Sequence, residues 1–150
     1  MIHAVSVGHM TWHNAVGTIS CNSTFTLAVT AHGSGVTARG PISSLTFTNC
    51  TNGTVHQPIT QPGTLEFHAT GITGNGTLTS SGMKWGITMF GIECGYTTNA
   101  TDIGDVVAGE HAVLRLKASL PRTFGSVFCG SSGNWTGEYK FTHPTGLSFH

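Results

Sequence analysis

Charge is the scarcest property of this 150-residue sequence. Asp, Glu, Lys and Arg make up 8% of the chain, against about 25% in an average soluble domain, and the six basic and six acidic residues cancel. A neutral chain without basic clusters does not suit nucleic acid binding or electrostatic attachment to a membrane. No apolar run approaches the roughly 18 residues of a membrane-spanning helix. We therefore expect no nucleic acid partner and no membrane span.

Motifs of catalysis are missing as well. No Ser has Gly both two residues before and two residues after it, as a nucleophile elbow requires. The sequence contains no G-x-x-x-x-G-K-[ST] loop and no dinucleotide-binding G-x-G-x-x-G. Its nine His residues include no His-x-His pair, the spacing that places two metal ligands on one face of a strand. We expect no catalytic residues, no cofactor and no enzyme activity, and we interpret the His residues as polar surface groups.

The abundant residues are Thr (24), Gly (21), Ser (13) and Asn (7), beside 38% hydrophobic residues. Thr and the β-branched and aromatic residues favour strands, while Gly and Asn favour tight turns between them. Apolar and polar residues alternate with a period of two in residues 24–30, 44–50, 64–70, 83–90, 92–97, 112–118 and 134–141. We therefore predict one all-β domain over residues 1–150, an antiparallel β-sandwich or barrel.

The segment 97–111 is the candidate for a long loop, because it shows no such alternation. It contains half of the six acidic residues. Asp102 and Asp105 are the weak candidates for metal ligands here, since carboxylate oxygens bind Ca²⁺. The segment lacks the 12-residue pattern of an EF-hand, so a solvated loop without metal is the alternative.

Four widely spaced cysteines point to disulfides. Cys21, Cys50, Cys94 and Cys129 include no C-x-x-C pair, so they do not resemble a zinc knuckle or a redox motif. An even number in a β-rich chain indicates two disulfides and an oxidising compartment. Of three connectivities we favour Cys21–Cys50 and Cys94–Cys129, which would join neighbouring strands; reduced core thiols are the alternative. No export signal opens the chain, so we expect Met1 to begin a mature or recombinant form.

Six of the seven Asn residues begin an N-x-[ST] triplet, the acceptor pattern for N-glycosylation. They are Asn22, Asn49, Asn52, Asn75, Asn99 and Asn134. Asn52-Gly53 and Asn75-Gly76 are also typical of two-residue hairpin turns. The triplets therefore have two interpretations, glycan sites in a secretory pathway or turns between strands.

Three stretches resemble a known group of proteins. They are "SSLTFTNCTNGTV" (43–55), "GITMFGIECGYTT" (86–98) and the ending "SVFCGSSGNWTGEYKFTHPTGLSF" (126–149). Together they resemble a family of exported, largely uncharacterised bacterial β-rich proteins, and more loosely the secreted type called an activator of alkane oxidation. The resemblance covers about the last two thirds of the chain. It implies export, β-structure and paired cysteines, and it supplies no catalytic residue.

Two hypotheses for function follow. The first is a cell-surface or extracellular-matrix structural or interaction protein that assembles with itself into filaments or fibres by β-strand pairing. Residues 1–20 would then be a donor strand, with an ordinary first strand of the chain's own domain as the alternative. The second is a secreted binding module for a glycan or an apolar small molecule, which needs exposed aromatic residues or an apolar cavity.

Overall fold

The structure is a computed structural model. It describes residues 2–28, 38–56, 63–69, 75–107 and 109–143. The described residues are all-β, as the sequence predicts, apart from one short 3-10 helix. In chain order the elements are β1 (Ile2–Ser6), β2 (Met10–His13), β3 (Thr18–Leu27), β4 (Ala38–Thr51), β5 (Thr54–His56), β6 (Thr64–Ala69), β7 (Gly76–Ser81), β8 (Lys84–Met89), β9 (Ile92–Thr97), β10 (Thr101–Val107), β11 (Val113–Gly125), η1 (Val127–Cys129) and β12 (Ser132–His143). Within the described residues, no helix is long and apolar enough to cross a membrane.

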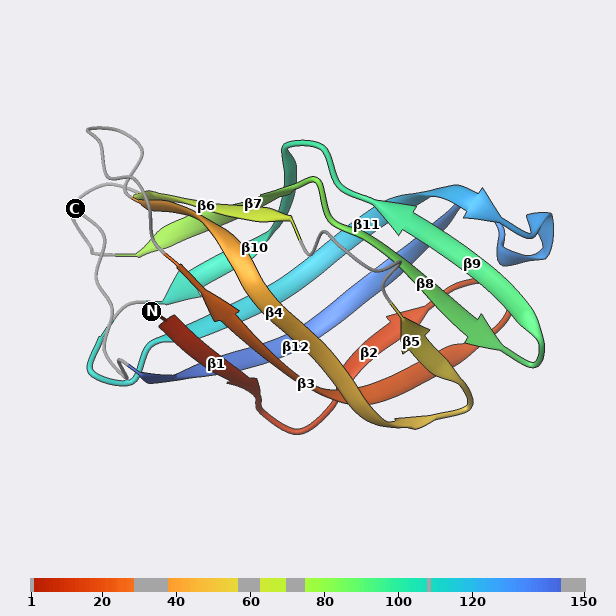
Figure 1. Cartoon of the computed structure of the whole chain (residues 1–150), viewed down its shortest axis with the longest axis horizontal. Coiled ribbons are helices and arrows are strands. Elements are labelled where there is room, and N and C mark those ends of the chain that lie inside the picture. The colour runs from red at the N-terminus through yellow and green to blue at the C-terminus, as the bar shows by residue number, and fades with distance from the viewer. Residues whose placement is uncertain (1, 29–37, 57–62, 70–74, 108, 144–150) are drawn as a thin grey trace.

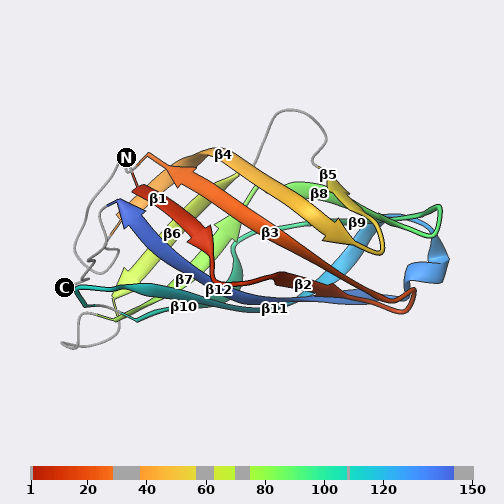
Figure 2. The same ribbon diagram turned by 90° about the horizontal axis from the view of Figure 1, so that it is seen from below.

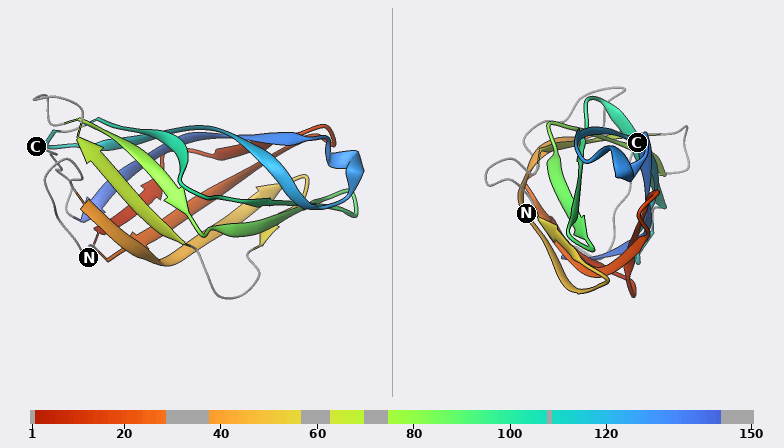
Figure 3. Two further views of the ribbon diagram at one scale, coloured as in Figure 1. Left: turned by 90° about the horizontal axis from the view of Figure 1, so that it is seen from above. Right: turned by 90° about the vertical axis from the view of Figure 1, so that its right-hand side faces the viewer.

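The strands are arranged around a ring (Figures 1 and 3). In the described part of the chain, there are eight strand positions around the ring. Four of them are each filled by one long strand, namely β3, β4, β11 and β12. Each of the other four is filled by two strands that follow one another in the sequence, namely β1 with β2, β5 with β6, β7 with β8 and β9 with β10. Neighbouring positions follow chain order and pair antiparallel. The ring closes where β12 pairs with both β1 and β2. Of the two predicted architectures, the structure is the barrel-like one.

The ring is irregular at a seam between β4 and β5. β4 pairs with β6 only through residues 38–41. Its later residues, 45–51, pair with β3 on one side. β5 pairs with β8, and among the described residues no ladder joins it to β4. Figure 2 shows β3 and β4 forming one wall, with β10, β11 and β12 along the opposite wall.

An aromatic cluster lies at the centre of the hydrophobic core. Trp12 and Trp135 face each other on β2 and β12, and their rings stack with centroids 4.7 Å apart and 11° between planes. Trp85 and Tyr96 pack against Trp12 at 4.9 and 6.1 Å. Beside Trp135 lies an apolar cavity of about 10 Å³, at the lower limit for one water molecule. Side chains therefore fill the interior.

Both predicted disulfides are present. Cys21 on β3 bonds to Cys50 on the neighbouring β4, as expected. Cys94 on β9 bonds to Cys129, which lies in η1, the helix that follows β11, and not on a strand. The first bond joins two adjacent strands, and the second ties the β11–β12 connection to the sheet. Two disulfides are consistent with an oxidising, extracytoplasmic environment.

Two local predictions are wrong. The segment 97–111 is not a long loop, because β10 occupies residues 101–107. The strand has an irregular register between Asp102 and Gly104, and its buried residues, Ile103 and Val106, are three positions apart in the sequence. The alternation with a period of two is therefore interrupted in β10.

The Asn52-Gly53 turn is confirmed between β4 and β5, with φ of 66° and 157°. At Asn75-Gly76, in contrast, Gly76 already pairs with Ala69 inside the β6–β7 ladder.

The segment proposed as a donor strand lies in the ring of its own chain. β1 pairs with β3 and β12, and so does β2. Donation of residues 1–20 to a second copy stays a prediction, and it would require these strands to leave their places.

We expect each disulfide to contribute about 3–4 kcal/mol to the free energy of unfolding, since the bridged residues are 29 and 35 positions apart and a cross-link reduces the entropy of the unfolded chain. Urea unfolding of the double variants Cys21→Ala/Cys50→Ala and Cys94→Ala/Cys129→Ala, followed by fluorescence of the buried tryptophans, measures this. A loss below about 1 kcal/mol for either pair would contradict the expectation.

Candidate functional site

Large exposed apolar side chains are concentrated at one end of the ring. Among the described residues four are exposed, and three of them are Phe90 (74%), Val127 (76%) and Phe128 (73%). They lie on the β8–β9 turn and in η1, at the right-hand end in Figure 1. We call this end, formed by residues 14–17, 89–92 and 125–130, the apolar tip. The fourth, Val7 (50%), lies between β1 and β2.

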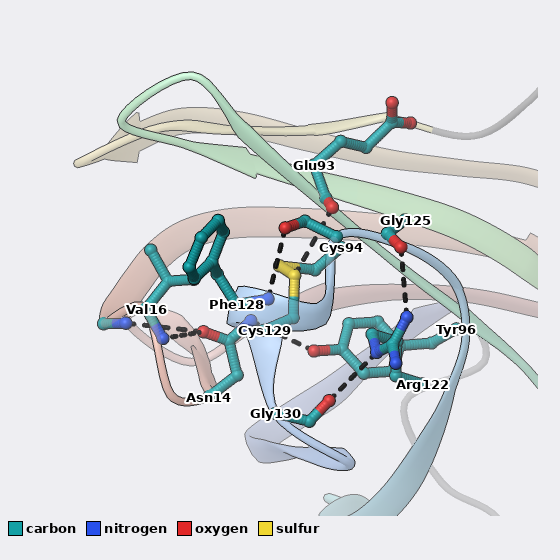
Figure 4. Close-up of a disulfide and its surroundings, with 12 residues drawn as sticks. Asn14, Val16, Glu93, Cys94, Tyr96, Arg122, Gly125, Phe128, Cys129 and Gly130 are labelled. Atoms are coloured by element: carbon teal, nitrogen blue, oxygen red, sulfur yellow. Dashed lines mark hydrogen bonds between the residues drawn. A yellow bond between two sulfur atoms is a disulfide. The ribbon is translucent and has the colours of Figure 1, made fainter.

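Three connections far apart in sequence meet at the apolar tip (Figure 4). The Ala15 N–H donates to the Cys129 carbonyl at 3.3 Å, which joins the β2–β3 turn to η1. The Ser126 N–H donates to the Glu93 carbonyl at 2.8 Å, which joins η1 to β9. The Cys94–Cys129 disulfide makes the second of these links covalent. The tip is therefore held as one unit.

The buried Asn14 side chain stabilises the β2–β3 turn by hydrogen bonds. Its side-chain Oδ1 accepts from the Val16 N–H at 2.9 Å and the Gly17 N–H at 3.3 Å. Its Nδ2 donates to the Tyr96 hydroxyl at 3.0 Å. Because Asn14 and Tyr96 are both buried, these bonds satisfy polar groups that water does not reach. Asn14 is also the one Asn that begins no N-x-[ST] triplet.

Arg122 holds the other side of the apolar tip. Its Nε donates to the Gly130 carbonyl and its Nη1 to the Gly125 carbonyl, both at 3.0 Å. The guanidinium thus bridges the two ends of the η1 segment. Burial raises the pKa of Tyr96, and the Asn14 hydrogen bond and the nearby Arg122 charge oppose that rise.

Phe90 has an unusual backbone conformation for an aromatic residue. Its φ is 52° and that of Gly91 is 76°, and the two residues connect the paired Met89 and Ile92. Left-handed conformations at both positions are typical of a two-residue hairpin turn that favours Asn-Gly or Gly-Gly. A bulky side chain at such a φ is strained, and burial does not compensate Phe90, since it is 74% exposed.

Apart from the Arg122 guanidinium that lies against its carbonyls, the apolar tip contains no formally charged residue. Residues 14–17, 89–92 and 125–130 include no Asp, Glu, Lys or Arg. Polar groups there are backbone amides, Asn14 and the Ser126 hydroxyl, which accepts from the Phe128 N–H at 3.2 Å. The arrangement offers an apolar contact surface and no acid, base or nucleophile positioned for catalysis.

The predicted metal candidates lie elsewhere. Asp102 and Asp105 are exposed on β10, far along the sheet from the apolar tip. An oxygen of Asp102 accepts from the Gly104 N–H at 3.3 Å, and Asp105 is opposite Arg115 of β11. The residues that the structure describes contain no group of three or more His, Cys, Asp or Glu side chains placed to hold a metal ion. This placement gives a calcium site no support.

The six N-x-[ST] asparagines are spread over the surface. Asn49, Asn52, Asn99 and Asn134 are exposed, and Asn22 and Asn75 are half-buried. Asn52 also donates through Nδ2 to the Thr18 carbonyl at 3.2 Å. Glycosylation stays a prediction at all six positions.

The tryptophans form no exposed platform. Trp12, Trp85 and Trp135 are at most 2% exposed. Within the described residues, none of their indole N–H groups has a hydrogen-bond partner. Their rings pack against one another in the aromatic cluster of the core.

No protein-family model, curated protein or solved structure matches the chain. The resemblance to exported bacterial proteins therefore stays a prediction, and the candidate site rests on its geometry.

The apolar tip was not among the site residues that the sequence indicated. Two local signals mark it in retrospect. "MFGI" places Phe where a two-residue turn favours Asn or Gly, and "GSVFCGSSG" places two large apolar residues in a Gly/Ser-rich connection.

The Asn14–Tyr96 pair should stabilise the apolar tip measurably. We expect Asn14→Ala to lower the free energy of unfolding by about 2–4 kcal/mol, because it leaves the buried Tyr96 hydroxyl and two part-buried backbone N–H groups without their partner. Tyr96→Phe, which removes one hydroxyl, should lower it by about 1–2 kcal/mol. Urea unfolding of both single variants and the double variant gives the coupling energy. Strict additivity would contradict the pairing.

Both tyrosines of the chain should resist ionisation in the folded protein. Burial raises the pKa of Tyr96 and Tyr139 above the ordinary value of 10.0. The stability that they contribute is therefore fully present below about pH 10 and is lost as the pH rises through the folded-state pKa values. Absorbance at the tyrosinate band should show ionisation near pH 10 in urea and only above it without urea. Identical titrations in both conditions would contradict this.

Proposed function

We propose that the protein is an exported, non-enzymatic interaction protein that docks on a cell surface or matrix partner through its apolar tip. The observation that carries the proposal is the gathering of Phe90, Val127 and Phe128, each about three-quarters exposed, at one end of the ring. Apolar side chains gathered on an otherwise polar surface mark contact sites. The disulfides agree with export, because such bonds persist in oxidising compartments.

The construction of the apolar tip supports a binding role. Its three connections are joined by hydrogen bonds and by the Cys94–Cys129 disulfide, so little loop ordering remains when a partner binds. A preorganised surface loses less conformational entropy on binding and keeps more of its contact energy.

The strain at Phe90 supports the same conclusion. Asn or Gly at this turn position would remove the backbone penalty, and Phe gains little burial in the folded chain, since it is 74% exposed. Positions that break a local rule without a structural gain are those where function is expected.

Self-assembly through strand pairing is the second candidate, and the seam favours it. Residues 45–51 of β4 and the strand β5 each pair on one side in the described part of the chain. Such edges can accept a strand from another copy, the step needed for a filament or fibre.

The alternative of a binding module for a glycan or an apolar small molecule has less support. Its two expected features were an exposed aromatic platform and an apolar cavity. The three tryptophans are buried, and the apolar cavity beside Trp135 is about 10 Å³, far below the size of a ligand pocket. A larger hollow of about 310 Å³ lies between the start of β11 and the end of β12, but the one Phe that lines it, Phe141, is buried, so it offers no exposed aromatic platform.

Sedimentation with washed cells of the exporting organism tests the proposed function. The variant Phe90→Asn/Val127→Ser/Phe128→Ser should bind at least about tenfold more weakly than the natural chain, since each truncated apolar anchor contributes on the order of 1 kcal/mol or more. Val7→Ser, at the exposed apolar residue outside the tip, is the matched control and should bind normally.

Equal sedimentation of the tip variant and the natural chain would refute docking through the apolar tip. Sizing of the same samples at rising concentration tests self-assembly separately. Assembly that the tip variant retains would favour the strand-pairing candidate.

A further inference from the structure

The chemistry of the apolar tip also indicates what it docks on. We propose that Phe90, Val127 and Phe128 insert into the apolar zone just below the headgroups of a lipid bilayer, so that the protein is held on a membrane surface without spanning it. This inference rests on the proposed function, because it names the partner of the same apolar tip.

The small area of the apolar tip argues against a second copy as the partner. An aromatic side chain buries about 150–250 Å². With three-quarters exposure, the two Phe residues and Val127 therefore offer roughly 400 Å². Two tips in contact would bury about 800 Å² in total, below the roughly 1,200 Å² at which stable protein interfaces begin.

Part of the backbone of the apolar tip, the η1 segment and the adjoining Ala15, suits an apolar medium. In hydrocarbon, each unpaired N–H or C=O group is costly, so segments that enter it must satisfy these groups internally. In the η1 segment the N–H groups of Ser126, Phe128, Cys129 and Gly130 all have acceptors within the protein. The Ala15 N–H is bonded to Cys129 in the same way.

The polar side chains behind the apolar tip suit the headgroup layer. Exposed His13 and Thr18 flank the β2–β3 turn and hydrogen-bond to each other at 2.7 Å, and exposed Ser131 follows η1. The one acidic or basic residue directly behind the tip on β9 is the exposed Glu93. The Arg122 guanidinium also lies against the tip, but it donates to the Gly125 and Gly130 carbonyls of the η1 segment. With this one cation engaged by the protein and no cluster of basic residues at the tip, we expect attachment to depend on apolar burial and not on anionic lipid.

Vesicles of pure phosphatidylcholine test the inference with no protein partner present. The natural chain and Val7→Ser should sediment with the vesicles, equally at low and at 0.5 M salt, because phosphatidylcholine has no net charge for a cation to attract. Phe90→Asn/Phe128→Ser should bind at least about tenfold more weakly. Phe90→Asn alone, which places a favoured turn residue at a left-handed position, keeps the test valid where the double variant folds poorly.

Insertion depth provides an independent readout. A Phe128→Trp variant should gain fluorescence that brominated lipids quench, whereas the three buried tryptophans of the natural chain should be quenched far less. Absence of binding to phosphatidylcholine, equal binding by the tip variant, or binding that needs phosphatidylserine and disappears in salt would each overturn the inference. If washed cells still bind the protein through its tip while vesicles do not, docking stands and the partner is a component of the cell surface other than the lipid bilayer.

Discussion

Closure of the ring by β12 is the interaction on which the rest of the structure depends. Residues from the two ends of the described chain meet there, since β12 pairs with β1, β2 and β11. This pairing places Trp12 directly opposite Trp135 and so forms the centre of the aromatic cluster. The same pairing places the β2–β3 turn beside η1 at one end of the ring. It thereby brings Ala15 and Cys129 together at the apolar tip.

The apolar tip contains residues that stabilise it and one residue that strains its backbone. Asn14, Arg122 and the Cys94–Cys129 disulfide rigidify it from within, whereas Phe90 strains its outer turn. A sequence that served stability alone would place Asn at residue 90, as it does at residue 52, where the turn before β5 has Asn-Gly. The contrast between two turns of the same chain distinguishes a turn that follows the backbone preference from one that exposes a bulky apolar side chain at a backbone cost.

The sequence was informative wherever local pattern and three-dimensional position coincide. Period-two alternation identified most strands, and the spacing of the cysteines together with the strand pattern led to the correct disulfides. β10 was missed because its bulge at residues 102–104 interrupts the alternation. The apolar tip was missed for a different reason. Its members come from three connections that only the closed ring brings together, and the pattern along a chain does not contain that proximity.

The structure also sets the two hypotheses about assembly against each other. Donation of β1 and β2 to a second copy would break their pairing with β3 and β12 and so open the ring. The β2–β3 turn would then have to unfold, because it connects the donated strands to the rest of the chain. That turn is part of the apolar tip, where the Asn14 side chain and the Ala15–Cys129 hydrogen bond hold it closed. Strand exchange would therefore dismantle the apolar tip, whereas addition of a strand at the seam between β4 and β5 would leave it intact. Of these two routes of assembly, only addition at the seam is compatible with the proposed docking through the tip.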